Sequence, residues 1–95
     1  MLLVAEAEPT MASLSFTDQE RAVIELVERA CGGMILETTR VDVHKLEGGT
    51  VPTLRFTLEE RASTDLELAR IASGEESASA LASGVVAELR KQMGS

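Results

Sequence analysis

The sequence predicts an α+β domain of order α-β-β-β-α, a three-stranded antiparallel meander with two helices packed on one face. Both ends of the chain carry apolar residues at helical spacing, whereas the middle alternates with a period of two. Capping residues and glycines bound the first helical segment. One pairing register of the two alternating segments places their apolar residues on the same face and also sets opposite charges across from each other. Ninety-five residues suffice for one such domain.

Residues 17–31 have the signals of a helix. Thr17 can cap its N-terminus, and Glu20, three residues later, completes a capping box. Gly32 and Gly33 then stop the helix. The apolar face that we expect to be buried consists of Val23, Ile24, Leu26, Val27, Ala30 and Cys31.

Two segments in the middle of the chain, residues 39–44 and 53–58, alternate as strands do. Gly48 and Gly49 between them suit a turn, so a hairpin is predicted. Residues 34–36 do not keep the phase of the first strand, and we therefore expect either a bulge near Thr38 or a buried start of the strand. The predicted cross-strand pairs are Val43 with Leu54, Val41 with Phe56, and Asp42 with Arg55.

Residues 64–72 allow two interpretations. Thr64 and Glu67 could form another capping box, which favours a helix and the order α-β-β-α-α. Leu66 and Leu68 share a face only in a strand, and we predict a third antiparallel strand here. A turn at residues 61–63 would pair Leu58 with Leu66 and Phe56 with Leu68.

The last helix is predicted to begin at Ser73, with Glu76 completing a capping box. Its buried stripe is predicted to be Ala78, Ala82, Val85, Val86, Leu89 and Met93. The opposite side holds only small residues, among them Gly84, which costs about 1 kcal/mol relative to Ala in a helix. A close neighbouring chain would explain that side, and so would the good helix propensity of alanine in water.

The order of elements over residues 17–93 is similar to that of the double-stranded-RNA-binding domain. The resemblance rests on order and spacing and not on motif residues. That family opens its last helix with a basic cluster, whereas this chain has Glu75 and Glu76 there, which would repel phosphate. The resemblance therefore implies a fold and does not extend to RNA binding.

Composition narrows the function classes. The net charge is −7, the nine Lys and Arg residues form no basic stripe, and Phe16 and Phe56 are the only aromatic residues, so direct nucleic-acid binding is disfavoured. The single Cys31 fits a reducing cytoplasm. Residues 1–14 are predicted to be a flexible tail before one domain over 15–95, with Met1 and Met11 as alternative starts. We expect no signal peptide or membrane span in this opening, because it has no basic start and its apolar run is too short.

Catalytic and metal-binding chemistry has little support. His44 could be oriented by Asp42 as a general base, but no nucleophile can be placed beside it, and an exposed strand-end histidine explains it better. Cys31 lies at a helix C-terminus, where the helix dipole disfavours a thiolate. The acid pairs at residues 59–60 and 75–76 fit strand alternation and helix capping. We expect no enzyme, cofactor or metal.

These observations predict a small acidic, cytoplasmic protein-interaction module, an adaptor, subunit or inhibitor that binds another protein chain, with a homodimer as one possible form. The alternative is an acidic mimic of nucleic acid, of phage or mobile-element type, that inhibits a nucleic-acid-binding protein. Neither hypothesis involves a membrane. The predicted partner interface consists of Ala80, Gly84, Ala87, Lys91, Arg55 and Ile71, the last two on the outer face of the sheet.

Overall fold

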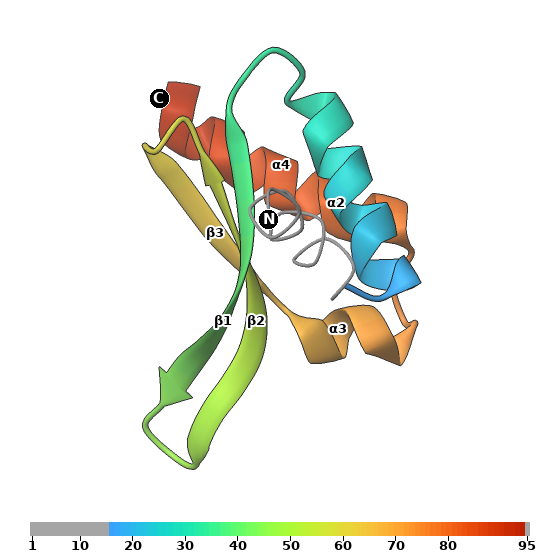
Figure 1. Cartoon of the computed structure of the whole chain (residues 1–95), viewed down its shortest axis with the longest axis vertical. Coiled ribbons are helices and arrows are strands. Elements are labelled where there is room, and N and C mark those ends of the chain that lie inside the picture. The colour runs from blue at the N-terminus through green and yellow to red at the C-terminus, as the bar shows by residue number, and fades with distance from the viewer. Residues whose placement is uncertain (1–15, 95) are drawn as a thin grey trace, which may run out of the picture.

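A computed structural model describes residues 16–94 and shows an α+β domain built on a three-stranded antiparallel meander, as the sequence predicts (Figure 1). The predicted tail over residues 1–14, with Met1 and Met11, lies outside the described residues. No helix within residues 16–94 has the length and apolar character to cross a membrane. The elements are α2 (Asp18–Ala30), β1 (Leu36–Lys45), β2 (Gly49–Leu58), β3 (Ala62–Glu67), α3 (Leu68–Ser73) and α4 (Ala78–Gly94).

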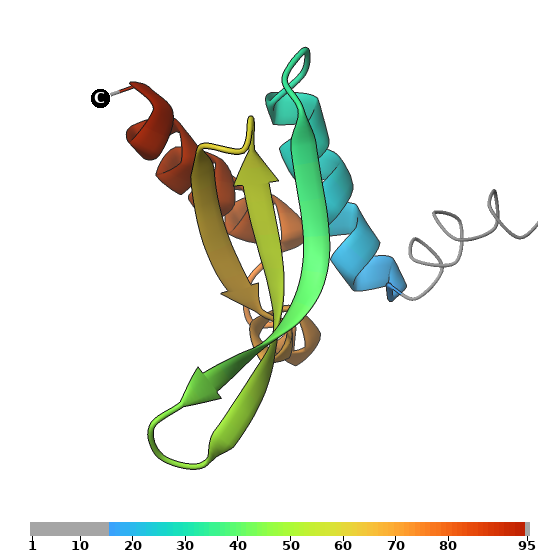
Figure 2. The same cartoon turned by 60° about the vertical axis from the view of Figure 1, so that its left-hand side comes forward.

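The helices cover one face of the sheet, here called the inner face. Helix α4 packs on β3 and β2 and along α2, so that α2 and α4 lie together behind the sheet in Figure 2. Phe56 at the centre of β2 is fully buried, as is Leu89 of α4. Because burial of each large apolar side chain contributes about 1.5–3 kcal/mol, this layer supplies the main stabilisation of the fold. Its largest fully buried apolar side chains are Phe56, Leu54, Leu58, Leu89, Val23 and Val27.

The first helix confirms its predicted cap and adds a role for the capping glutamate. The Thr17 hydroxyl accepts from the Glu20 N–H, and Glu20 Oε1 accepts from the Thr17 N–H, both at 3.1 Å. The Glu20 side chain is also buried, and Arg40 of β1 donates to its Oε1 at 2.9 Å. One carboxylate therefore caps α2 and ties β1 to it.

The predicted register of the first hairpin is wrong by three residues. Val41 lies opposite Thr53 and Val43 opposite Val51, and the partner of Arg55 is Thr39 instead of Asp42. Because side chains alternate with a period of two, this odd shift moves the valines of β1 to the outer face. Gly48 and Gly49 both adopt positive φ, which turns the chain earlier than the alternation predicts.

The bulge expected near Thr38 is also absent, because β1 pairs with β2 without interruption from Leu36 to Lys45. Leu36 faces the core opposite Leu58, whereas Val41 and Val43 face outward. The change of phase between Leu36 and the two valines therefore needs no bulge, because the strand has apolar residues on both faces of the sheet.

Residues 64–72 combine both interpretations. They belong to a strand as far as Glu67 and then to the short helix α3, so the strand predicted over the whole segment ends five residues early. The turn lies at Glu59 and Glu60, both with positive φ, and the Arg61 N–H donates to the Leu58 carbonyl at 3.0 Å. The observed pairs are Leu58 with Ala62 and Leu54 with Leu66, an even shift that keeps the apolar residues inside.

The cap of the last helix lies four residues later than predicted. The hydroxyl of Ser77 accepts from the Ala80 N–H at 3.1 Å, which makes Ser77 its capping residue. Ser73 instead ends α3, where its hydroxyl donates to the Arg70 carbonyl, and Gly74 follows in the left-handed conformation. Leu81, which the predicted stripe omits, is buried, while Ala78 and Met93 are partly buried at its margins.

Candidate functional site

The β3 edge of the sheet is covered by a side chain of α4. Gln92 donates from Nε2 to the Ser63 carbonyl at 2.8 Å, and its Oε1 accepts from the Ser63 N–H at 2.9 Å. The two bonds reproduce the pair that a neighbouring strand would form. Gln92 is further held by Glu88, whose carboxylate accepts from Nε2 at 3.1 Å. Strand addition at this part of β3 would have to displace the Gln92 side chain.

The opposite edge belongs to β1, which has a strand neighbour on one side only, in the sheet of the described residues. The Glu59 N–H donates to the Ile35 carbonyl at 2.7 Å, so odd-numbered residues of β1 exchange backbone bonds with β2. The even-numbered residues therefore direct their backbone N–H and C=O groups away from β2. They are Leu36, Thr38, Arg40, Asp42 and His44.

Arg40 fixes the middle of this edge strand to the helical layer. Its guanidinium bonds to the buried carboxylate of Glu20 and lies 5.6 Å from the centre of the Phe16 ring. An arginine over an aromatic face contributes a further attraction when it is partly desolvated. The Arg40 side chain keeps 41% of its surface exposed, so it can still contact a molecule at the edge.

Beyond Arg40 the hairpin of β1 and β2 extends past the rest of the sheet, as the lower part of Figure 1 shows. This happens because β3 ends at Glu67, which pairs with Thr53. The outer face of this projecting arm carries half-buried apolar side chains that none of the described helices covers, and Leu46 at its tip is fully exposed. The half-buried residues are Val41, Val43 and Val51.

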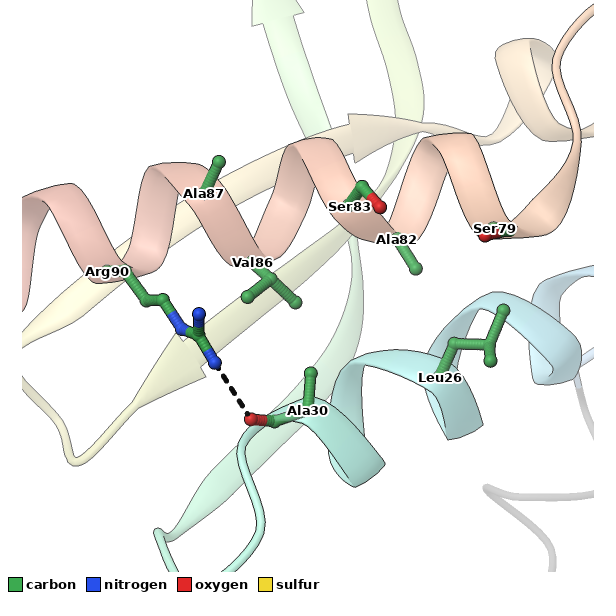
Figure 3. A pocket seen from close by; sticks show the side chains of 8 residues that line it. All are labelled: Leu26, Ala30, Ser79, Ala82, Ser83, Val86, Ala87 and Arg90. Carbon is green, nitrogen blue, oxygen red and sulfur yellow. Dashed lines mark hydrogen bonds between the residues drawn. The ribbon is translucent and has the colours of Figure 1, made fainter.

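A shallow groove of about 360 Å³ runs between α2 and α4 (Figure 3). The guanidinium of Arg90 closes one end, where it donates to the Ala30 carbonyl at 3.4 Å. The lining holds hydroxyls and one arginine among apolar side chains, without an acid, a histidine or a thiol, so it offers no acid–base chemistry. It consists of Leu26, Ala30, Ser79, Ala82, Ser83, Val86, Ala87 and Arg90.

The six residues predicted as a partner interface do not form one surface. Ala80, Gly84, Ala87 and Lys91 are all exposed on α4. A Cβ added at Gly84 would have no heavy atom within 4 Å, so the interior of the fold gives no reason for this glycine.

The two residues predicted for the outer face of the sheet lie elsewhere or are already paired. Ile71 is buried in the core, because α3 replaces the strand that would have turned it outward, and that part of the prediction is wrong. Arg55 does lie on the outer face, where it donates to both carboxylate oxygens of Asp65 at 2.8 and 3.0 Å. These bonds raise the pKa of Arg55 and hold the pKa of Asp65 below its ordinary value.

The residues considered for catalysis are dispersed. His44 and Asp42 are exposed on one side of the projecting arm, and Cys31 is buried at the end of α2. Glu59 accepts from the Ile35 N–H at 2.8 Å, so it acts as part of a turn. Within residues 16–94 no three His, Cys, Asp or Glu side chains come together as metal ligands would.

Comparison of the chain with protein-family models, with curated proteins and with solved structures finds no match. The site is therefore described by its geometry. Neither of its defining features was predicted from the sequence: the cover that Gln92 gives to Ser63 of β3, and the β1 edge, which has a strand neighbour on one side only among the described residues. A correct register would have indicated which backbone groups of β1 face outward, whereas no sequence signal marks Gln92.

Proposed function

We propose that this chain is a non-catalytic protein-interaction module of the cytoplasm that binds another polypeptide by strand addition at the edge of β1. The observation that carries the proposal is the difference between the two sheet edges. Gln92 occupies backbone groups of β3, while β1 presents a ten-residue edge. A partner strand would gain main-chain hydrogen bonds there, with side chains of β1 setting its preference.

The apolar outer face of the projecting arm supports the same function. Val41 and Val43 are half-buried and no helix within residues 16–94 covers them, so a strand added beside β1 would contact them with alternate side chains. The charges of the edge strand, Glu37, Asp42 and Lys45 among them, would select against partners of the wrong charge pattern.

A proline pair tests the proposal. Thr38→Pro removes an N–H that points away from β2, so it blocks an added strand without removing a bond of the sheet. We expect it to abolish capture of the native partner from host extract, with the circular dichroism spectrum unchanged. Thr38→Val is the matched control, because it keeps the N–H and should retain the partner. Undiminished capture by the folded proline variant would contradict strand addition at this edge.

A second candidate, an acidic mimic of nucleic acid, is favoured by exposed carboxylates that have no ion-pair partner among residues 16–94. Such a protein would bind a basic groove, and its affinity would fall steeply with salt, whereas strand addition depends much less on salt. Titration of the captured complex with sodium chloride separates the two. The carboxylates are those of Asp18, Glu25, Glu28, Glu37, Asp42, Glu47, Glu60 and Glu75.

A further inference from the structure

We propose that the strand added to β1 is β1 of a second copy of this chain, in an antiparallel pair centred on Val41, which joins two sheets into one of six strands. This inference rests on the proposed function and names its partner. It follows from the hydrogen-bonding parity of β1, from the order of its charges and from the position of its valines.

Parity restricts the registers open to such a pair. The outward backbone groups belong to even-numbered residues of β1, so an even residue of one copy must face an even residue of the other. A two-fold axis then passes through a residue position that faces itself in both copies. The candidates in the middle of the strand are Arg40, Val41 and Asp42.

Charge selects among these three. Centring the pair on Arg40 sets two arginines opposite each other, and centring it on Asp42 sets two aspartates opposite each other, and like charges at such positions are destabilising. Centring it on Val41 sets Arg40 of each copy opposite Asp42 of the other. The same register sets Glu37 opposite Lys45, so the dimer gains four pairs of opposite charge.

The groups in these pairs are placed to reach across the edge. Asp42 is exposed, and the Arg40 side chain is 41% exposed beside the carboxylate of Glu20. Lys45 lies 3.5 Å from Glu67, and both side chains are about half exposed. In the dimer its ammonium group would lie between Glu67 and Glu37 of the second copy, which gives it two carboxylate neighbours.

The valines supply the apolar part of the contact. In the register centred on Val41, the two copies of this residue form a pair without backbone bonds between them, where Cα atoms approach to about 4.5 Å. Val43 of each copy faces Thr39 of the other. The outer face would then carry a continuous apolar row across the junction, and the half-buried Val41 side chains would lose much of their contact with water.

Cysteine scanning with sedimentation tests the register directly. A Cα separation near 4.5 Å permits a disulfide, so Val41→Cys should form a covalent dimer on mild oxidation. Val43→Cys is the matched control, because its two copies would lie about 13 Å apart along the strands and should remain monomeric on a non-reducing gel. The unmodified chain should sediment as a reversible dimer.

Charge exchange provides a second readout that does not depend on oxidation. Glu37→Lys and Lys45→Glu each place like charges across the junction and should each weaken self-association about tenfold. An equimolar mixture should recover the parent affinity, because each introduced charge then faces the opposite introduced charge, and native Lys45 faces native Glu37. Circular dichroism of each variant verifies that it is folded.

Three results would overturn the inference. They are a parent chain that sediments as a monomer at every concentration, equal cross-linking of the two cysteine variants, or a mixture of charge variants no tighter than either alone. The proposed function fails separately, when Thr38→Pro retains the native partner. A monomer whose heterologous partner is lost on Thr38→Pro would refute the second copy and leave strand addition standing.

Discussion

At the β3 edge of the sheet a side chain amide occupies the backbone groups of Ser63, whereas at the β1 edge alternate backbone groups face away from the sheet over ten residues. Proteins generally cover, shorten or charge their sheet edges, because an open edge pairs with other chains. Here the six-residue strand is covered and the ten-residue strand is charged. The cover obstructs strand addition at Ser63, while a charged edge admits partners whose charges complement those of the strand.

The largest expected effect is a difference in the free energy of unfolding between proline variants at two adjacent positions of β1. Thr39 is hydrogen-bonded to β2 opposite Arg55, so Thr39→Pro removes a ladder bond and should lower the free energy of unfolding by at least about 2 kcal/mol. Thr38→Pro removes only an outward N–H and should cost less than half as much. Urea denaturation of both variants measures the difference, and equal losses would show that the inferred parity is wrong.

Removal of Gln92 should open the covered edge. Gln92→Ala loses two hydrogen bonds to Ser63 on an exposed surface. We expect the free energy of unfolding to fall by about 1 kcal/mol and amide exchange at Ser63 to become faster. Gln92→Glu is the matched variant, because it can accept from the Ser63 N–H but cannot donate to its carbonyl, and it adds a charge beside Glu88. Unchanged exchange at Ser63 in both variants would contradict the cover.

The sequence was sufficient for α2, for the existence of α4 and for the three strands, because these follow from periodicity, whereas the cap of α4 was placed wrongly and α3 was expected only in the alternative order. Thr17 and Glu20 signalled the start of α2 correctly, since all the atoms of that cap lie within four residues. The alternating segments gave the strands and their order. Local patterns of this kind determine element type because they reflect geometry within one turn or one pleat.

The register of the strands and the contacts between residues distant in sequence could not be predicted from the sequence. The charges of Asp42 and Arg55 suggest a cross-strand pair, but Arg55 bonds to Asp65 of β3 instead. The register predicted for the third strand did not set Asp65 opposite Arg55. The turn at Glu59 and Glu60 uses positive φ at two residues that seldom adopt it, so no turn signal marked it. The two edges could not be compared because the cover depends on Gln92, distant in sequence from Ser63.

The small-residue side of α4 offers a test that sharpens the comparison by excluding a rival surface. Gly84→Ala should raise the free energy of unfolding by about 0.5–1 kcal/mol, because a Cβ there meets nothing and alanine favours the helix. Gly84→Arg should leave self-association unchanged, because the proposed dimer contact lies on β1 and not on α4. Dissociation of the dimer by Gly84→Arg, with the fold intact by circular dichroism, would instead identify α4 as the interface and remove β1 from that role.

The smallest expected effect concerns the outer face of the sheet. There Arg55 links β2 to β3 through Asp65, whereas no ion pair joins β1 to β2 within residues 16–94. The hydrogen bonds from Arg55 lower the pKa of Asp65, so the folded state favours the carboxylate. A lowered pKa contributes stability above the unfolded value of about 3.9, and this contribution is lost as the pH falls through the folded value. Asp65→Asn should therefore be less stable than the parent at pH 7, and the difference should decrease progressively as the pH falls from about 5 through the folded value. Both side chains are partly exposed, so the difference should also shrink in high salt. Thermal unfolding over this pH range, with Glu47→Gln as a control for loss of one exposed negative charge, measures it. A difference that does not decrease on acidification would show that Asp65 acts through packing and not through its charge.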